Sequence, residues 1–455
     1  MTPHVQALVV GGGISGLVCA YALRKAGLDA HLFEASPRPG GVIQSIARDG
    51  FLLELGPQSF SGTAPLRALF QDLGISDQVV QAPAHAPRYV LVDGVFRRVP
   101  LSPPAFFTSS LINVSDKWAL VRDLIGKSVP PDADESVAAF VRRKFSPQLL
   151  DRLVGPFVSG VYAGDPERLS LRSAFPSLHE AEKSAGSIIR GMSRAAKTKT
   201  GPRERPSLLA FRDGNETLVR AIANILGPAL HTGISIAAIS AQNDSSFKIC
   251  FESNSAAGPI SAKSLILATP TNVTGKLLSP LDPSFESLLT PMDYSPVAVV
   301  SLGYRISDLG HSLDGFGFLV PRSSGLRVLG TVWNSSLFPS RAPEGHALLT
   351  SFVGGATDPS VASLPPKILT SLVHSEISPI LAIAAEPVFS NVTFWPRALP
   401  QYNLGHGDRL AAVAKLLRKH PGIWLVGNYL KGPAIGSCVE QALSIADEVH
   451  EALEE

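Results

Sequence analysis

Val9-Val10-Gly11-Gly12-Gly13-Ile14-Ser15-Gly16 is the stretch that decides the fold of this chain. A β-branched, apolar run precedes it, a helical pattern follows over 17–26, and 30–33 is typical of a second strand. Gly11 allows a tight turn, Gly13 lets the backbone approach a pyrophosphate, and Gly16 lets helix and strand pack closely. Ile14 and Ser15 open the helix, whose N-terminus favours phosphate charge. The stretch therefore predicts a βαβ dinucleotide-binding unit.

The residues after the second strand favour FAD over the nicotinamide dinucleotides. Glu34 ends that strand, where its carboxylate can accept the ribose hydroxyls, and this disfavours the 2′-phosphate of NADP. Ala35 and Arg38 follow, and the arginine is predicted to pair with phosphate. Gly40-Gly41, followed by Val42, permits close passage of a ribityl chain.

Two further segments complete the predicted cofactor site. Gly56-Pro57-Gln58-Ser59 supplies a second backbone turn. Gly427-Asn428 ends a strand near the C-terminus, and Ala434-Ile435-Gly436 starts the last helix. Backbone N–H groups there can meet the pyrimidine edge of a flavin and stabilise negative charge on the reduced ring.

Length and composition limit the classes of protein to consider. A chain of 455 residues predicts two domains with a third subregion. Only 17% of residues are charged and 45% are hydrophobic, which favours a large core, an apolar ligand cavity or a membrane-facing patch. The net charge of +2 gives no indication of a nucleic-acid partner, and no apolar run approaches the ~20 residues that span a bilayer.

Cysteine usage predicts neither a disulfide framework nor a metal site. Cys19, Cys250 and Cys438 are few and scattered, so no zinc or iron–sulfur centre is expected, and Cys19 is interpreted as a small core residue. Few cysteines and no signal peptide favour a cytoplasmic location.

The rest of the chain is predicted to form strands and helices around this unit. Strands are predicted over 235–239, 247–251, 264–268 and 424–426, and a terminal helix over 435–453. A second group, over 297–304, 316–320, 326–332 and 347–353, fits an antiparallel sheet in a second domain. Helices are predicted over 136–145 and from the Ser146-Pro147 cap onward, with an exposed basic loop over 197–206.

The glycine-rich turn, the segment 34–41 and the C-terminal segment together resemble the amine oxidase and phytoene desaturase superfamily of FAD enzymes. The resemblance implies an α/β fold: a Rossmann-like FAD-binding domain with an inserted α+β substrate domain and a helical, membrane-facing subregion. The expected boundaries are 1–85, 206–285 and 391–455 for the FAD-binding parts, 86–205 for the helical subdomain and 286–390 for the substrate sheet. Ile236, Thr269 and Trp395 are added to the expected cofactor contacts. Asn428 departs from the superfamily, which often has Asp there, so a neutral hydrogen bond replaces a charged one.

The middle of the chain is more specific. The segments 156–166 and 169–176, with 86–90, 315–319, 336–339 and 395–402, closely resemble the protoporphyrinogen oxidase family. The resemblance implies that Arg88 binds a propionate, that Leu319 and Phe338 sandwich the ring, and that the backbone at Gly160 approaches the substrate. A surface arginine, two plain core residues and a turn glycine are the competing interpretations.

The activity implied by this resemblance is oxidation of protoporphyrinogen IX to protoporphyrin IX. FAD accepts hydride in three two-electron steps, and O2 reoxidises it to give hydrogen peroxide. No side chain is named as catalytic, because the cofactor does the chemistry while the protein orients the substrate. A homodimer and hand-over of the product to ferrochelatase stand as further partner expectations.

Membrane contact is expected from Leu101–Phe107, which can form an apolar patch docking on the inner face of the cytoplasmic membrane; a buried, Pro-kinked loop is the alternative. Three other functions stay open. The first is coproporphyrinogen III oxidase of the same flavin family, whose substrate carries four propionates instead of two. An amine oxidase or carotenoid desaturase is the second, and a non-catalytic flavin-binding protein is the third.

Overall fold

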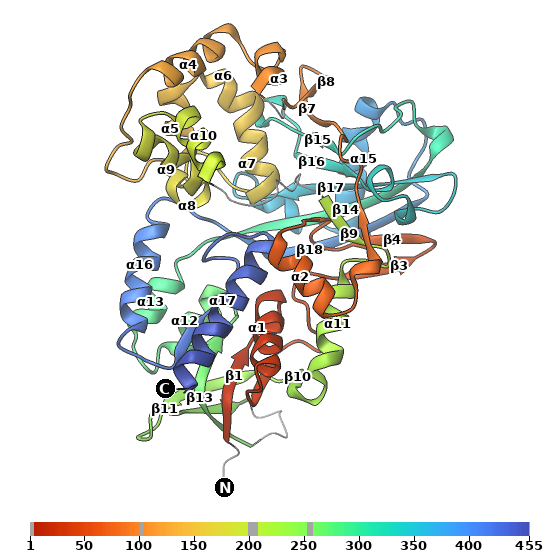
Figure 1. Cartoon of the computed structure of the whole chain (residues 1–455). Helices are drawn as coiled ribbons and strands as arrows, with labels where there is room; N and C mark the ends of the chain where they lie inside the picture. Colours follow the sequence, from red (N-terminus) through yellow and green to blue (C-terminus); the bar gives the residue numbers. More distant parts are fainter. Residues whose placement is uncertain (1–3, 101–102, 199–207, 253–257, 455) are drawn as a thin grey trace.

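The structure is a computed structural model that describes residues 4–100, 103–198, 208–252 and 258–454. Both ends of the chain lie in one part of the molecule, built on the first sheet (Figure 1). A second sheet and a helical region occupy the opposite end (Figure 1).

The first sheet is the predicted dinucleotide-binding unit. Residues of β1 alternate between two cores: Ala7 and Val9 pack with α1 and α17, and Leu8 and Val10 pack on the other side. Both faces are therefore covered, which explains why the strand is apolar throughout. The strands run in the order β10 (Leu230–Thr232), β2 (Ala30–Glu34), β1 (His4–Val10), β13 (Ile260–Leu267), β12 (Phe247–Phe251) and β11 (Ile236–Ala241), with β19 (Ile423–Leu425) also paired to β13.

Helices cover the two faces of this sheet. On one face lie α1 (Ile14–Lys25), α11 (Glu216–Leu226) and α17 (Ile435–Glu454). On the other lie α12 (Thr271–Leu278), α13 (Ser284–Leu289) and α16 (His406–Leu417). The predicted strands and the terminal helix are confirmed, with boundaries shifted by a few residues. Cys19 is a buried core residue of α1, as expected.

The second sheet contains the four predicted strands and three more. Its neighbouring strands are antiparallel except β15 and β7, so the sheet is mixed. Helix α15 (Pro366–Leu381) packs on it through Leu369, Val373 and Ile377. The order is β18 (Phe389–Pro400), β14 (Tyr294–Arg305), β17 (His346–Gly354), β16 (Val328–Trp333), β15 (Gly317–Leu319), β7 (Arg88–Val92) and β8 (Val95–Arg98). Edge strand β18 carries this sheet beyond the boundary expected at residue 390.

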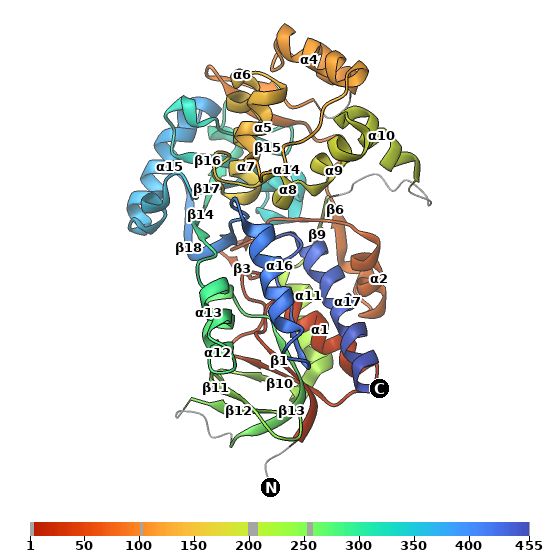
Figure 2. The same cartoon turned by 90° about the vertical axis from the view of Figure 1, so that its left-hand side faces the viewer.

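The helical region stands at the far end from the termini (Figure 2). Ser146 Oγ accepts from Leu149 N at 3.1 Å, so the predicted N-cap is confirmed. Ser136 Oγ accepts from Ala139 N at 3.1 Å, which makes Ser136 an N-cap that was not predicted. A π-helical segment, Leu150–Val154, joins α6 to α7. The helices are α3 (Pro103–Thr108), α4 (Val114–Ile125), α5 (Val137–Lys144), α6 (Pro147–Leu149), α7 (Gly155–Tyr162), α8 (Leu171–Ala174), α9 (Pro176–Ala185) and α10 (Ile188–Thr198).

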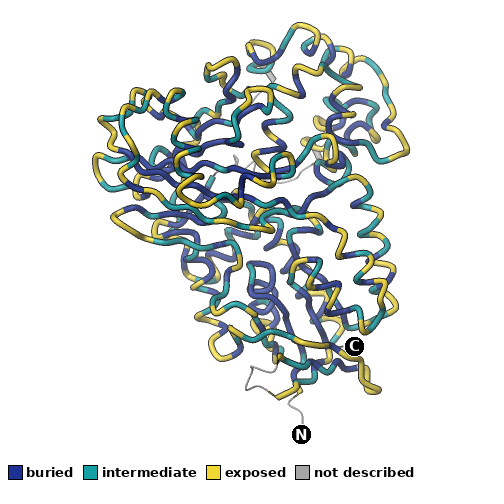
Figure 3. The backbone as a smooth tube through the Cα atoms, turned by 180° about the vertical axis from the view of Figure 1, so that it is seen from behind, coloured by how far each residue is buried: buried dark blue, intermediate teal, exposed yellow. Residues whose placement is uncertain are grey.

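Short elements join these parts. They are β3 (Ser45–Arg48), β4 (Phe51–Glu54), β5 (Phe60–Ser61), α2 (Ala64–Asp72), β6 (Val79–Gln81), β9 (Leu208–Phe211) and α14 (Asn334–Leu337). Buried positions concentrate along the strands of both sheets, and exposed positions on helices and turns (Figure 3). Within the described residues, no helix combines the length and apolar character needed to cross a bilayer. Leu101, Ser102 and most of the predicted basic loop, from 199 on, lie outside the described residues.

Candidate functional site

The glycine-rich turn has the geometry of a phosphate cradle. Gly11 has φ +104°, and a Cβ there would lie 2.9 Å from the Ala268 backbone. A Cβ on Gly16 would lie 1.9 Å from Gly11 O, so helix and strand meet only because Gly16 has no side chain. Gly13 caps α1 without a side-chain hydrogen bond, and a Cβ on it would meet nothing within 4 Å. Open space thus lies at an uncapped helix N-terminus, where an anion fits.

Glu34 lies directly beside this turn. Its Oε2 accepts from Gly12 N at 2.5 Å, and its Oε1 accepts from Ser36 N at 2.8 Å. Ser36 Oγ also donates to Oε1, at 2.6 Å. A carboxylate has about four acceptor sites, so one remains for a ribose hydroxyl. The Glu34 carbonyl also accepts from Ile234 N at 3.0 Å, which brings the segment leading to Ile236 to this position.

The segment 38–41 folds back onto the glycine-rich turn. Gly40 N donates to Gly12 O at 2.7 Å, and Gly40 and Gly41 have φ +107° and +58°. Arg38 Nη2 donates to Gly41 O at 2.7 Å, so its guanidinium fastens its own turn. Its predicted contact with phosphate stays a prediction.

The turn 54–59 is held close to Val42 and Trp395. A Cβ on Gly56 would lie 2.0 Å from Val42 O, and Trp395 Nε1 donates to Leu55 O at 2.6 Å. Gln58 Nε2 donates to the carbonyls of Glu54 and Gly56, both at 2.9 Å. The structure therefore brings together residues far apart in sequence that were predicted to line the cofactor.

The C-terminal contacts lie around the start of α17. Gly427 N donates to Gln441 Oε1 at 3.1 Å, and a Cβ on Gly436 would lie 3.0 Å from Thr63 Cγ2. Thr269 follows β13 and lies beside the glycine-rich turn, because a Cβ on Gly11 would lie 3.1 Å from Thr269 Cγ2. The Asn428 carbonyl accepts from the Tyr402 hydroxyl.

Three of the predicted substrate residues lie on three adjoining elements. Arg88 and Leu319 belong to paired strands β7 and β15, and Gly160 belongs to α7. A Cβ on Gly160 would lie 2.4 Å from Leu319 Cδ2, so these two residues are in contact. Arg88 is exposed, and within the described residues no carboxylate forms an ion pair with it.

Phe338 lies deeper, at 3% exposure, in an apolar cluster that includes Leu337 and the half-buried Phe316. The guanidinium of Arg88 lies 5.3 Å from the centre of the Phe316 ring, and that of Arg341 lies 5.7 Å from the centre of the Phe338 ring. Two of the three aromatic rings of this cluster thus have an arginine over them.

A buried ion pair that was not predicted lies beside this cluster. Arg341 Nη2 lies 2.8 Å from Glu54 Oε1, and the two side chains are 1% and 2% exposed. Burial raises the pKa of Glu54 to about 7, against the opposing effects of Arg341 and of the hydrogen bonds from Ser45 and Asn215. The only sequence signal for Glu54 is that it ends an apolar strand just before Gly56. No sequence signal indicates Arg341.

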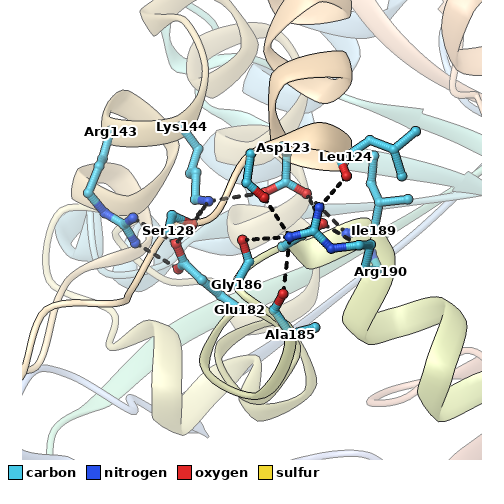
Figure 4. Close-up of polar contacts among 12 residues, drawn as sticks. Asp123, Leu124, Ser128, Arg143, Lys144, Glu182, Ala185, Gly186, Ile189 and Arg190 are labelled. Atoms are coloured by element: carbon cyan, nitrogen blue, oxygen red, sulfur yellow. Dashed lines mark hydrogen bonds and ion pairs between the residues drawn. The ribbon is translucent and has the colours of Figure 1, made fainter.

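A second unpredicted polar cluster stabilises the helical region (Figure 4). Glu182, on α9, is fully buried and accepts from Arg143 Nη1 at 2.8 Å and Ser128 Oγ at 2.7 Å, with Lys144 Nζ at 2.8 Å. Burial acts to raise the pKa of Glu182, but these partners outweigh it and lower the pKa to about 2. Asp123 links the same cluster to α10 through Ile189 N at 3.1 Å.

With this geometry in place, the comparison with known proteins decides the family. Residues 14–450 match the family described as flavin containing amine oxidoreductase. The chain belongs to this family. Its cofactor is therefore FAD, which the uncapped helix N-terminus and the space at Gly13 fit. When bound, the phosphates would lie at Gly11–Gly16 and the ribose at Glu34.

Named relatives cover nearly the whole chain. The chloroplastic protoporphyrinogen oxidase of Nicotiana tabacum is 34% identical over 98% of this chain and 85% of its own length. The coproporphyrinogen III oxidase of Bacillus subtilis (strain 168) is 30% identical over 95% of both chains. The crystal structure of a provisionally assigned protoporphyrinogen oxidase from Exiguobacterium sp. 255-15 superimposes with TM-score 0.80 at 25% identity over 100% of both chains.

Proposed function

We propose that this chain oxidises protoporphyrinogen IX to protoporphyrin IX with FAD and O2, and releases hydrogen peroxide. Relatives named for oxidation of a porphyrinogen support the substrate class. Bound FAD supplies the hydride acceptor, and the chain supplies binding and orientation. Arg88 pairs with a propionate, while Leu319 and Phe338 contact the macrocycle.

The observation that carries this proposal is the position of Arg88. Arg88 is exposed and has no carboxylate partner within the described residues, and its guanidinium lies over the Phe316 ring. The adjoining strand ends in Leu319, which packs against α7 at Gly160. An unpaired cation beside an apolar wall matches a large apolar ring with carboxylate arms.

The test is anaerobic addition of protoporphyrinogen to the purified FAD-bound protein. We expect the flavin absorption to bleach, and to return with release of hydrogen peroxide when O2 is admitted. Absence of bleaching with both protoporphyrinogen and coproporphyrinogen would overturn the proposal and leave a flavin-binding protein or another oxidase.

The competing function is oxidation of coproporphyrinogen III to coproporphyrin III, and one observation favours it. Arg97 lies opposite Val90 on the strand next to Arg88, so its side chain is on the same face of the sheet as that of Arg88. Arg97 is exposed and, like Arg88, forms no ion pair with the described carboxylates. A substrate with four propionates would use more of these cations than one with two. The ratio of kcat/KM for the two porphyrinogens decides between them.

We also propose that the helical region contacts a membrane surface. Helix α4 exposes Val114, Trp118 and Ile125, at 68%, 64% and 76%, on one face, because these positions are separated by four and seven residues. Arg122 and Lys127 are exposed nearby, which suits an anionic lipid surface. Of the Phe106–Phe107 pair, only Phe107 is exposed, at 46%, while Phe106 packs against the helical core.

A further inference from the structure

The Glu54–Arg341 ion pair joins the two halves of the molecule where the proposed substrate and cofactor meet. Glu54 ends β4 and begins the turn 54–59 that borders the proposed cofactor site. Arg341 follows α14, three residues after Phe338. Their side chains lie 2.8 Å apart and are almost completely buried.

Each partner also contacts a third segment. Glu54 accepts from Asn215 N at 2.9 Å and from Ser45 Oγ at 2.6 Å. Arg341 donates to Phe211 O at 3.2 Å. The pair therefore fixes the segment 334–341 to the turn 54–59 and to the residues that lead into α11.

A second hydrogen bond holds the other end of the same segment. Asn334 Nδ2 donates to Gln58 Oε1 at 2.7 Å, and both side chains are buried. Phe338 lies between Asn334 and Arg341, so the short stretch that carries it is attached at both ends to the turn 54–59. Neither end can shift without moving the Phe338 ring relative to that turn.

Stability alone does not account for this pair. A buried ion pair is often no more stabilising than apolar residues of the same volume, because removing two charges from water costs several kcal/mol. Arg341 Nη1 is buried with no hydrogen-bond partner among the described residues, which adds to the cost. The guanidinium lies over the Phe338 ring, however, and its position there is set by Glu54.

We propose that Arg341 is a positioning residue: its ion pair with Glu54 fixes Phe338 against the turn 54–59 and thereby sets how the porphyrinogen ring meets the flavin. The inference rests on the proposed function. Arg341 touches neither substrate nor cofactor and acts through Phe338.

The experiment compares E54Q/R341M with the wild-type holoprotein. Gln keeps one acceptor oxygen for Asn215 N, and its NH2 group can donate to Ser45 Oγ. Met leaves no unpaired charge, so we expect bound FAD and a Tm within a few degrees of wild type. We expect the Kd for protoporphyrin IX, read from the flavin difference spectrum, to rise about tenfold, and the KM for protoporphyrinogen to rise more than kcat falls. R341K, which keeps the charge but loses the planar guanidinium, should show a smaller shift in the same direction.

The matched control is D358N/R327M. Arg327 and Asp358 form a bidentate pair at 2.8 and 2.9 Å in the same half of the molecule, and neither belongs to the proposed site. This control should change Tm but not the Kd for protoporphyrin IX. In addition, F338L and R341K should not add in their effects on Kd, because Arg341 acts through Phe338.

The outcomes separate the two proposals. A wild-type protein that neither binds nor oxidises either porphyrin substrate refutes the proposed function and the inference with it. A wild-type protein that is active, together with E54Q/R341M of unchanged Kd and KM, refutes the positioning role alone. If E54Q/R341M does not fold, R341K is the deciding variant. An R341K protein that binds FAD and has an unchanged difference spectrum and an unchanged KM would also refute the positioning role.

Discussion

The backbone of Gly160 and the side chain of Leu319 are packed so closely that a Cβ on Gly160 would lie 2.4 Å from Leu319 Cδ2. The contact joins α7 of the helical region to the end of β15 in the second sheet. Leu319 is half-buried and packs against the apolar cluster of the helical region. The absence of a side chain at residue 160 therefore determines where Leu319 lies.

Gly160→Ala should displace Leu319 and raise the KM for protoporphyrinogen about three- to tenfold, with FAD still bound. The stability change should be small, because Ala is favoured over Gly in a helix by about 1 kcal/mol and this offsets the crowding. Steady-state kinetics and Tm check both statements. Adding Leu319→Ala to Gly160→Ala should relieve the crowding but also removes the proposed contact of Leu319 with the substrate, so KM should stay raised. A double variant with wild-type KM would contradict the role of Leu319.

Glu34→Ala should weaken FAD binding at least tenfold, because it removes the ribose acceptor together with the hydrogen-bond partner of Gly12 N and Ser36 N. The ratio of flavin to protein absorbance after gel filtration measures retention. Glu34→Gln keeps one carbonyl acceptor and should retain more flavin than the alanine variant. Stoichiometric flavin in Glu34→Ala would refute the ribose role.

The features that the sequence predicted depend on neighbours in the chain. The glycine-rich turn follows from spacing alone, and the predicted N-cap Ser146 accepts from the N–H three residues further along. Hydrophobic periodicity predicted strands of both sheets, because it too depends on residues that are neighbours in the chain. Such local rules hold because the interacting groups are close in sequence.

The features that the sequence did not predict depend on partners far apart in the chain. Glu54 ends β4 and Arg341 follows α14, so only the tertiary fold brings them together, and nothing near either residue in the sequence indicates the other. The same holds for Glu182 with Arg143, and for the parallel pairing of β7 with β15, where a strand from early in the chain completes the second sheet. Periodicity reports the buried face of an element but not which element covers it.

The stability of the protein should depend on the ionisation of Glu54. Its pKa in the folded protein, about 7, lies above the ordinary value near 4.5, so the folded state binds this proton more tightly than the unfolded chain. The stabilising contribution is therefore present below pH 4.5 and is lost as pH rises through 7. Relative to Glu54→Gln, the wild type should lose up to about 3 kcal/mol of unfolding free energy over that range. Tm differences between the two proteins at pH 5 and pH 8 measure this, and a pH-independent difference would contradict it.

Removing the exposed apolar side chains of α4 should weaken membrane binding without unfolding the protein. Trp118 and Ile125 are 64% and 76% exposed on one helix face, so Trp118→Ser with Ile125→Ser removes contacts with lipid but few with the protein. We expect the fraction that sediments with anionic vesicles to fall several-fold, with Tm and flavin content unchanged. Ile225→Ser with Ile368→Ser is the matched control, because these residues are 53% and 52% exposed on α11 and α15, away from the helical region. Equal loss of sedimentation in both double variants would show that binding depends on general surface hydrophobicity and not on α4.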